Sequence, residues 1–489
     1  MDFEVKDDRF DTLVFQEDAN DHFVARSMDE LLEEKDRKTL GNMLERFFVS
    51  QKERLEVLDN YSRGNNTSVL TGRRRMENEK ADYRIHHNIG GYISNFITGF
   101  MLGNPVTITY DGGSDDGETN DLEDIRLITE YNDLYTLDHE LGFDASRYGR
   151  AFELHYRDDK NEDSIVLVDP KEMFVIRSAD VKKEMIGAVH CPVYNGKLYL
   201  TIYTDDHIYS YDPQGFTAIN QFRFRNEQIK PHLYGEVPVV EWWNNRFRIG
   251  DYEGQISSID AYDSAQSDTA NYMSDLNDAM LVIKGDLDSL GLDPTTLAIM
   301  KDANMLALGS GVSVEGKQTN VDAEYIYKQY DVAGTEAYKD RILGDIFRFA
   351  NVPNLEDDRF YSGNSGIALE YKLIGLKQIQ STKQAFFSKA LAKRYRLIDN
   401  IHQALNDVPI DSSKLGFVFH PNIPKDVWYE IDNYIKAGGF ISQETLRTIS
   451  SFTDHRTEQA RLDAEDEMNQ TDGYLAFLEM KRNEPSDEV

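Results

Sequence analysis

Cysteine is nearly absent from this sequence. Cys191 is the only one among 489 residues, which excludes an intramolecular disulfide and a metal site built from several thiolates, and which fits a reducing compartment. Long apolar runs are also missing. The longest, at 93–108, is interrupted by polar residues and is shorter than the roughly 18 to 20 residues that cross a bilayer. Because the chain starts with acidic residues and no basic, then apolar, stretch, we expect a soluble protein without a secretory signal.

Positive charge is scarce as well. The chain has 53 Lys and Arg against 87 Asp and Glu, a formal net charge of -34. Such a surface repels nucleic acid and anionic membranes, which excludes tight binding to either but allows a transient, sliding contact with DNA. Hydrophobic residues make up 40% of the chain, enough for a real core, and the length suggests two to four domains.

Motifs of known catalytic and cofactor sites are lacking too. Residues 311–318 have the spacing of a phosphate-binding P-loop, but Gln318 stands where a Ser or Thr hydroxyl should hold magnesium. His86 and His87 are adjacent, and adjacent helical residues do not face one way, so packing or capping is favoured over metal binding. Carboxylates are too numerous for any pair to be nominated as acid and base. We expect no catalytic residue, no metal and no cofactor.

The N-terminal quarter is predicted to be helical. Periodic apolar residues predict helices at 27–61, with Ser27 as N-cap, and at 81–102, ended by Gly103. A short strand is predicted at 106–110.

Negative charge is concentrated in residues 111–144. This segment holds twelve acidic residues and one basic residue, Arg126, a net charge of -11. Apolar residues at helical spacing predict an amphipathic helix whose carboxylates face water. A wall that repels a polyanion is the alternative interpretation.

Residues 151–243 have the alternating pattern of strands. Asn195-Gly196 is typical of a two-residue hairpin turn. The region is predicted to be mostly antiparallel, with strands at 152–156, 165–168, 173–176, 198–203, 207–211, 218–224 and 237–243.

A helix of roughly 26 residues is predicted at 255–280. Its apolar stripe is narrow and its other faces carry small and acidic residues, so it suits packing against copies of itself. A small mixed insertion at 281–330 and a second helix at 333–349 follow. Within the insertion we expect strands at 280–284, 305–308 and 325–327 and a helix at 293–302.

A polar loop at 352–366 separates that second helix from a third, at 367–405, in which Gly375 is a candidate kink. Residues 366–405 include seven basic and two acidic residues, a net charge of +5. We call this the basic belt. Pairing with acidic neighbours within or between subunits is one explanation and direct phosphate contact is another. Its lysines are Lys372, Lys377, Lys383, Lys389 and Lys393.

Two stretches of the chain resemble one protein family. Ala-Asp-Tyr-Arg-Ile-His-His-Asn at 81–88, leading to Gly-Phe-Met-Leu-Gly-Asn-Pro-Val-Thr-Ile at 99–108, resembles the wing region of portal proteins from tailed bacteriophages of the siphophage type with Gram-positive hosts. Residues 352–360 and 362–369 resemble that family's tunnel loop and the start of its long kinked helix. The order of segments over 27–453 also follows the family.

The resemblance implies an α+β, portal-like protomer with long stem and crown helices, an antiparallel β-rich wing and a small α/β clip, assembled as a ring. The implied parts are the wing at 1–254, stem helix 1 at 255–280, the clip at 281–332, stem helix 2 at 333–351, the tunnel loop at 352–366, the long kinked helix and return strand at 367–424, and the crown and acidic tail at 425–489.

The implied function is a ring of about twelve subunits, or about thirteen in isolation, at one vertex of the capsid. Assembled in the host cytoplasm, it would conduct double-stranded DNA during packaging and ejection. Its implied partners are other copies of the chain, double-stranded DNA without sequence specificity, the terminase large subunit as a separate motor, a head-completion or adaptor protein, and the major capsid and scaffolding proteins, without a membrane. Another acidic structural or scaffolding virion protein, or an enzyme of unknown class, are the alternatives.

A DNA conduit must bind weakly, because each fixed cation that neutralises a phosphate adds affinity that resists movement. Carboxylates of the first stem helix are therefore candidates for a repulsive channel wall, namely Asp260, Asp263, Asp268, Asp275 and Asp278. The tunnel loop would supply polar contacts that cannot read sequence, from Asn354, Glu356, Asp357, Asp358, Arg359, Tyr361, Ser362, Asn364 and Ser365.

Overall fold

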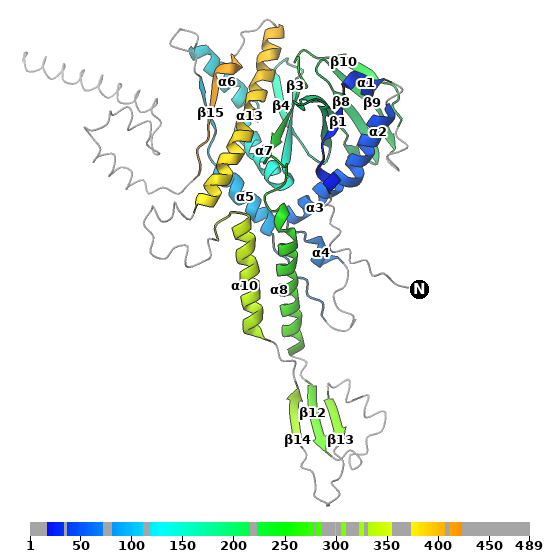
Figure 1. Ribbon diagram of the computed structural model, residues 1–489, viewed down its shortest axis with the longest axis vertical. Coiled ribbons are helices and arrows are strands. Elements are labelled where there is room, and N and C mark those ends of the chain that lie inside the picture. The colour runs from blue at the N-terminus through cyan, green and yellow to red at the C-terminus, as the bar shows by residue number, and fades with distance from the viewer. Residues whose placement is uncertain are drawn as a thin grey trace, which may run out of the picture. The chain divides into compact units, whose positions relative to one another are not determined.

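The computed structural model describes residues 17–33, 37–71, 81–110, 118–215, 223–276, 280–285, 299, 305–309, 322–326, 331–354, 373–405 and 411–422. The chain divides into two compact units, 1–421 and 422–489, and every helix and strand described here belongs to the first. Its fold is a mixed α/β one (Figure 1). We call the part formed by residues 17–255 and 373–421 the body.

The body combines helices from both ends of the unit with most of its strands. Its helices are η2 (Glu17–Asn20), α1 (Met28–Leu32), α2 (Arg37–Arg46), the π-helical η3 (Phe47–Gln51), α3 (Lys52–Ser62), α4 (Thr67–Leu70), α5 (Ile89–Leu102), α6 (Glu118–Tyr131), α7 (Leu134–Tyr148), η5 (Glu253–Gln255), α13 (Ile374–Leu405) and η7 (Ser412–Lys414). Its strands are β1 (Phe23–Ala25), β2 (Thr107–Tyr110), β3 (Arg150–Arg157), β4 (Asp163–Val168), β5 (Met173–Ser178), β6 (Met185–His190), β7 (Val193–Tyr194), β8 (Lys197–Tyr203), β9 (His207–Gly215), β10 (Gln228–Pro231), β11 (Val239–Trp243) and β15 (Leu415–Val418).

The N-terminal helices follow the predicted pattern with two differences. Ser27 is the N-cap of α1, since its Oγ accepts from the Glu30 N–H at 3.2 Å, but the helix predicted over 27–61 is divided into α1, α2, η3 and α3. The helix predicted at 81–102 begins only at Ile89, where the Asn88 side chain accepts from the Gly91 N–H at 3.0 Å. Residues 81–88 are therefore not helical, and the prediction for them is wrong.

The acidic segment forms two helices instead of one. α6 and α7 are separated at Asp133, whose backbone is left-handed with φ 47°. α7 ends at Gly149, with φ 84°, where a Cβ atom would lie 2.0 Å from the Arg248 carbonyl oxygen. Only glycine fits there, because a side chain would suffer both the backbone strain and the clash.

Two sheets stand side by side in the body. The larger has the strand order β1-β5-β6-β8-β9-β10, with β7 paired to β8. In this sheet β1 pairs with β5 in parallel, and all other strand pairs are antiparallel. The smaller has the order β11-β3-β4, which leaves β11 at an edge. The hairpin predicted at Asn195-Gly196 is confirmed by φ values of 51° and 71°, as a turn with two left-handed residues requires.

The strand prediction differs from the structure in several details, and the short strands β1 and β7 are among those it missed. β6 and β10 were not predicted: β6 has Gly187 in its middle, and β10 is exposed along its length, so neither shows an alternating apolar pattern. Most of the strand predicted at 218–224 lies outside the described residues. β2 is confirmed, and it pairs with β15, the return strand expected after the long helix.

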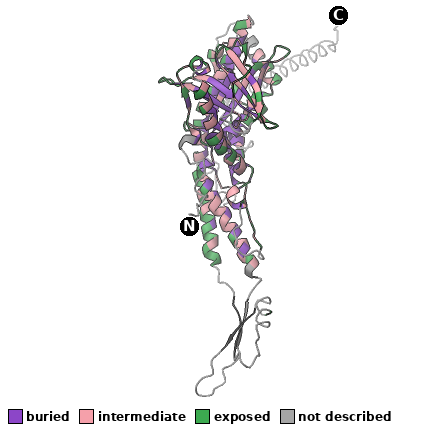
Figure 2. Ribbon diagram, turned by 90° about the vertical axis from the view of Figure 1, so that its right-hand side faces the viewer, coloured by how far each residue is buried: buried purple, intermediate pink, exposed green. Residues whose placement is uncertain are grey.

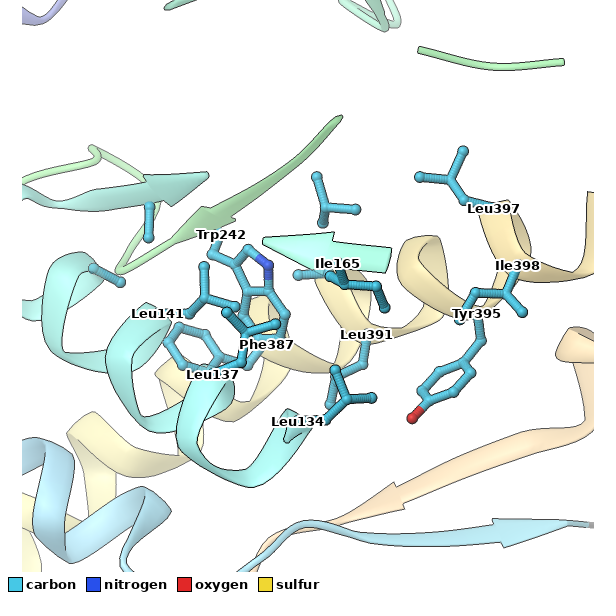
Figure 3. Close-up of a cluster of buried hydrophobic side chains, with 14 of the residues drawn as sticks. Leu134, Leu137, Leu141, Ile165, Trp242, Phe387, Leu391, Tyr395, Leu397 and Ile398 are labelled. Atoms are coloured by element: carbon cyan, nitrogen blue, oxygen red, sulfur yellow. The ribbon is translucent and has the colours of Figure 1, made fainter. Parts of the chain in front are cut away.

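The main core lies where α13 and α7 cover one face of the β11-β3-β4 sheet (Figure 3). Trp242 of β11 meets Phe387 of α13 edge to face, with ring centroids 5.1 Å apart. Leu141 of α7 and Leu397 of α13 are fully buried in the same cluster. Each such side chain contributes roughly 1.5–3 kcal/mol when removed from water, so this cluster anchors α13 on the body.

Between the two parts of the body the chain forms two long helices and a small sheet. α8 (Ile256–Leu276) and α10 (Val332–Phe349) are the helical pair, and both were predicted. The sheet consists of β12 (Met280–Gly285), β13 (Met305–Gly309) and β14 (Asp322–Ile326), with β13 parallel and β14 antiparallel to β12. The helix predicted at 293–302 lies, apart from residue 299, outside the described residues, and Gly375 is the second residue of α13 as described.

Candidate functional site

The helices of the helical pair lie side by side (Figures 1 and 2). α8 carries four aspartates and no basic residue. Its most buried positions include three polar ones, Asp263, Ser267 and Asn271, which are 0%, 0% and 5% exposed. Each of these side chains needs a hydrogen-bond partner, because a buried polar group without one is costly.

The partners lie on the non-helical segment at 83–87. Asn271 Oδ1 accepts from the backbone N–H of Tyr83 at 2.7 Å, and Ser267 Oγ accepts from that of Ile85 at 2.9 Å. Asp263 Oδ1 lies 2.7 Å from Nδ1 of His87. We call Asp263, Ser267 and Asn271 the polar ladder.

The repeat of the polar ladder has a geometric cause. Its residues are four apart on the helix, a rise of roughly 6 Å, and their partners are two apart along the segment, where extended chain covers roughly 6.6 Å. The two spacings nearly match, so α8 can hold every second residue of the segment in turn. This explains why 83–87 is not helical, although its apolar spacing predicts a helix.

The five aspartates predicted as a channel wall are not equivalent. Asp263 is fully buried and also accepts from Asn66 Nδ2 at 2.8 Å, so the prediction that it faces a channel is wrong. Asp260 accepts from the Tyr61 hydroxyl at 2.6 Å; burial raises its pKa, an effect that its hydrogen bonds oppose. Asp268 is exposed. The side chains of Asp275 and Asp278 lie outside the described residues.

Two lysines of the basic belt are bound to groups of the body inside the subunit. Lys383 Nζ lies 2.6 Å from Asp251 Oδ2, in the loop that leads to α8. Lys393 Nζ donates to the Val239 carbonyl at 2.8 Å, and burial lowers its pKa to about 8 although the nearby Glu236 opposes the shift. Those two lysines therefore hold α13 on the body. Lys389 is exposed, Lys377 is half-buried, and Lys372 lies outside the described residues.

The arginine that follows Lys393 makes the most buried ion pair of α13. Arg394 Nη2 lies 2.6 Å from Glu153 Oε2 and 2.7 Å from Asp138 Oδ1. Burial alone would raise the pKa of Glu153, but Arg394 and His155 lower it to about 2. Arg396, two residues further along α13, pairs with Glu236 at the surface at 2.6 Å. Pairing with acidic neighbours thus accounts for both arginines.

α10 exposes several apolar side chains. Val332, Tyr338 and Phe349 are 50%, 50% and 63% exposed. By contrast, the side chain of Ile346 on the same helix is fully buried. Exposed aromatic residues on a helix outside the main core point to contacts with another chain.

A match to a protein family covers most of the chain. The model of the family described as "Phage portal protein, SPP1 Gp6-like" matches residues 48–472. The chain belongs to this portal protein family. The match includes the segment at 83–87, the helical pair and α13.

This portal-family chain is similar to a curated relative and to chains of solved structures. The portal protein of Bacillus phage SPP1 is 24% identical over 321 residues, which are 63% of this chain and 60% of the relative. A chain from the neck of an empty GTA particle, computed with C6 symmetry, has 12% identity and a TM-score of 0.46, covering 80% of this chain and 99% of that one. A chain from the neck of the native particle, computed with C12 symmetry, has 11% identity and a TM-score of 0.44, covering 74% and 89%.

The tunnel loop expected for this portal-family chain is described only at its first residues. Val352 is buried and Asn354 is half-buried, and the other predicted contact residues, from Glu356 to Ser365, lie outside the described residues. Among the ranges that the structure describes, no helix has the length and apolar character for a bilayer crossing, and no group of three or more His, Cys, Asp or Glu side chains is arranged to hold a metal ion.

Proposed function

We propose that this chain is the repeating subunit of a portal ring at one vertex of a tailed-phage capsid, the conduit for double-stranded DNA during packaging and ejection. The observation that carries the proposal is the family match over residues 48–472, which includes both long helices and the small sheet between them. The parts would be the wing in the body, stem helices in α8 and α10, a clip in β12–β14, and a crown in the residues from 425 onward.

The helical pair supports the proposed ring assembly. In a single subunit Tyr338 and Phe349 of α10 stay half or more exposed, which leaves apolar surface for a neighbouring copy. Closed rings arise when the same two surfaces of each copy meet repeatedly. Our proposal is a ring of about twelve copies, in which neighbouring helical pairs bury these side chains.

The acidic side of α8 supports a weakly binding channel. α8 has no basic residue, and Asp268 is exposed on it. Asp260, Asp268, Asp275 and Asp278 remain our candidates for the channel wall, and the buried Asp263 does not. Carboxylates on the wall would repel phosphate and leave the duplex free to slide.

The loop at 352–366 would be the adjustable contact on the moving duplex. The loop leaves α10 close to Val352 and returns to α13, whose attachment to the body is strong. We propose that its polar side chains contact phosphates, which hold DNA without reading its sequence. The terminase large subunit, a head-completion or adaptor protein, and the capsid and scaffolding proteins are the proposed partners in the virion and during assembly in the host cytoplasm.

Electron microscopy and analytical ultracentrifugation of the purified chain test the ring. We expect rings with a central channel and about twelve copies, or about thirteen in isolation. A homogeneous monomer at every concentration and ionic strength tried would refute the proposal.

Replacing residues 354–365 by an equal number of Gly and Ser residues tests the loop separately. This variant keeps the connection between α10 and α13 and removes the side chains. We expect intact rings that fail to package or retain DNA. If particles built with this variant package and retain DNA normally, the loop does not have the proposed role.

A further inference from the structure

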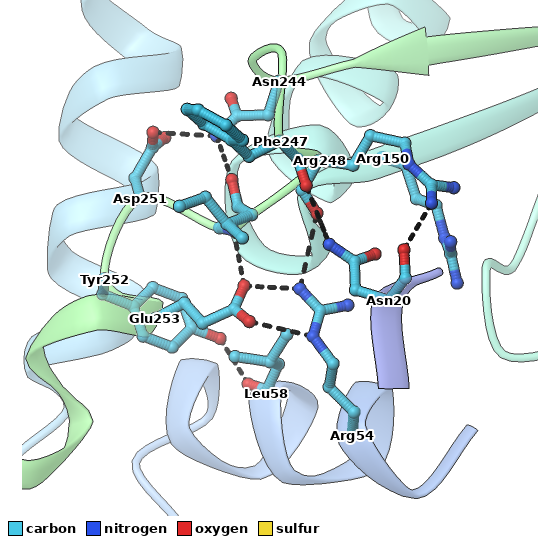
Figure 4. A network of polar contacts seen from close by, with 12 residues as sticks. Asn20, Arg54, Leu58, Arg150, Asn244, Phe247, Arg248, Asp251, Tyr252 and Glu253 are labelled. Atoms are coloured by element: carbon cyan, nitrogen blue, oxygen red, sulfur yellow. Dashed lines mark hydrogen bonds and ion pairs between the residues drawn. The ribbon is translucent and has the colours of Figure 1, made fainter. Parts of the chain in front are cut away.

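Four arginines gather where the two sheets of the body meet the loop after β11. Arg54 and Arg248 appear in Figure 4 together with Arg150, and Arg177 of β5 pairs with the same glutamate as Arg248. Three of these side chains are buried, Arg54 at 0% exposed, Arg150 at 2% and Arg248 at 3%, and that of Arg177 is 13% exposed. Because arginine keeps its proton at any ordinary pH, this part of the body contains four fixed positive charges.

Two glutamates oppose these arginines. The carboxylate of Glu253 accepts hydrogen bonds from both Nε and Nη2 of Arg54, at 2.8 and 2.5 Å. Glu241 lies beside Arg177 and within 3.5 Å of Arg248 Nη1. Burial by itself raises the pKa of Glu241, but Arg177 and Arg248 lower it to about 2, so Glu241 is charged. The described side chains of this cluster therefore have an excess of at least two positive charges.

Several nitrogens of the cluster have no hydrogen-bond partner within the described part of the chain. They are Arg54 Nη1, Arg150 Nε, Arg177 Nε and His22 Nδ1. Arg150 donates only from Nη2, to Gln51 at 2.9 Å, among its described contacts. A buried cation whose N–H groups are unpaired costs several kcal/mol. An anion next to these groups would offset both the charge and the missing hydrogen bonds.

A groove gives access to the cluster. It encloses about 910 Å³ and is lined at one end by His22, Arg177, Glu241 and Trp243. Trp243 lies opposite Arg150 in the pairing of β11 with β3, and the guanidinium of Arg177 stacks 5.0 Å from its ring centroid. β11 is the edge strand here, so a ligand reaches this end without displacing a neighbouring strand.

We propose that this end of the groove, lined by Arg177, His22 and Trp243, is a binding site for an oxyanion, a carboxylate or a phosphate. Two or three charge-assisted hydrogen bonds from guanidinium groups recognise such a group, and Trp243 supplies an apolar wall. Burial and the nearby arginines lower the pKa of His22 to about 4, so His22 is neutral at pH 7 and adds no further positive charge. The oxyanion is either a free ion or a carboxylate side chain of a neighbouring copy.

Titration of the full chain with potassium phosphate, at a constant ionic strength set by potassium chloride, tests the site. We expect a saturable change in tryptophan fluorescence, because Arg177 stacks on Trp243, and a parallel rise of the thermal midpoint. Arg177→Gln should weaken phosphate binding about tenfold or more, as expected for the loss of one charge-assisted hydrogen bond. Arg396→Gln is the matched control: it removes the same charge from another lining residue of the same groove, one that pairs with Glu236.

The outcomes separate specific binding from general screening. A response that does not saturate, or equal weakening by Arg177→Gln and Arg396→Gln, would overturn the proposal. If Arg177→Gln does not fold, Trp243→Phe replaces it. This variant keeps an aromatic wall, and we expect it to lose the fluorescence response and to keep the thermal stabilisation by phosphate.

Dissociated subunits and assembled rings distinguish the two sources of the oxyanion. Phosphate binding to both forms supports a free ion. Binding to dissociated subunits alone supports a carboxylate from the neighbouring copy, which would already fill the site in the ring. Failure to bind to dissociated subunits would refute the site, and it would leave the proposed ring untouched.

Discussion

In the body, charged side chains are buried against charged partners on elements that are far apart in the sequence; in α8 of the helical pair, the buried Ser267 and Asn271 are uncharged and bind backbone groups. Arg394 of α13 reaches Glu153 of β3 inside the main core, whereas Ser267 of α8 binds Ile85 of a non-helical segment. Figure 2 shows the same contrast, with buried residues gathered in the body and intermediate or exposed ones along α8 and α10.

This difference indicates how each region is stabilised. The body has a large apolar core, so it can offset the cost of burying ions that fix how α13 sits on the sheets. The helical pair has a narrow apolar seam, and it exposes aromatic residues of α10. We therefore expect the body to be stable in a single subunit and the helical pair to gain much of its stability from neighbouring copies.

The largest expected effect is that of Arg394→Met in the body. The substitution leaves Glu153 charged and buried without its main partner, which costs about 3–5 kcal/mol. Urea unfolding of dissociated subunits measures the loss. Arg396→Met is the control on the same helix: its partner Glu236 is at the surface, so less than about 1 kcal/mol should be lost. Equal losses in the two variants would contradict a special role of the buried pair.

Acid should weaken the body by a comparable amount. Glu153 and Glu241 have folded-state pKa values of about 2 against 4.5 for the free side chain. Their contribution is complete above pH 4.5 and is lost as the pH falls from 4.5 to about 2, by roughly 3 kcal/mol for each carboxylate. The measurement is urea unfolding at a series of pH values from 7 to 3.

Asp144 provides an internal check on the acid prediction. Burial raises its pKa to about 6 although Arg147 opposes the shift, so ionising Asp144 costs stability as the pH rises from 3.8 to 6. Asp144→Asn should remove this opposing contribution and steepen the net loss of stability between pH 6 and 4. If the free energy of unfolding of the natural chain stays constant from pH 5 to pH 3, this would contradict both the lowered pKa of the two glutamates and the raised pKa of Asp144.

The polar ladder should show a smaller and more local effect. Ser267→Ala removes the group that accepts from the Ile85 N–H and leaves that donor unpaired, at a cost of about 1–2 kcal/mol. We expect faster hydrogen exchange at 83–87, by about tenfold, and little change in global unfolding. Ser257→Ala is the matched control, because Ser257 is exposed on the same helix. Unchanged exchange at Ile85 would show that the ladder does not hold the segment.

Local signals in the sequence predicted the elements that neighbouring residues define. Ser27 before Glu30 and the pair Asn195-Gly196 act through their own backbone, so the N-cap of α1 and the β7–β8 turn were predictable. The positions of α8 and α10 followed from apolar periodicity for the same reason, although the helix predicted at 255–280 is described only over Ile256–Leu276.

Contacts between distant residues were not predictable in this way. Residues 83–87 read as the first turns of a helix, because their competing partner, α8, begins about 170 residues later. Asp263 was expected in the channel wall because periodicity separates polar from apolar faces, and it does not tell whether another segment covers a polar face. The ion pairs of Lys383 and Arg394 could not be predicted for the same reason, since their acidic partners lie on other elements.

The smallest effect on a single subunit is expected for Tyr338→Ser in α10. The side chain is half exposed, so the free energy of unfolding of dissociated subunits should change by less than about 0.5 kcal/mol. If neighbouring copies bury Tyr338, the same substitution should sharply reduce the fraction of chain in rings, as measured by sedimentation velocity. Tyr338→Phe keeps the apolar ring and should assemble as the natural chain does. Normal assembly of Tyr338→Ser would mean that the exposed face of α10 is not where copies meet, and the contrast between a self-sufficient body and a dependent helical pair would then have to rest on α8 alone.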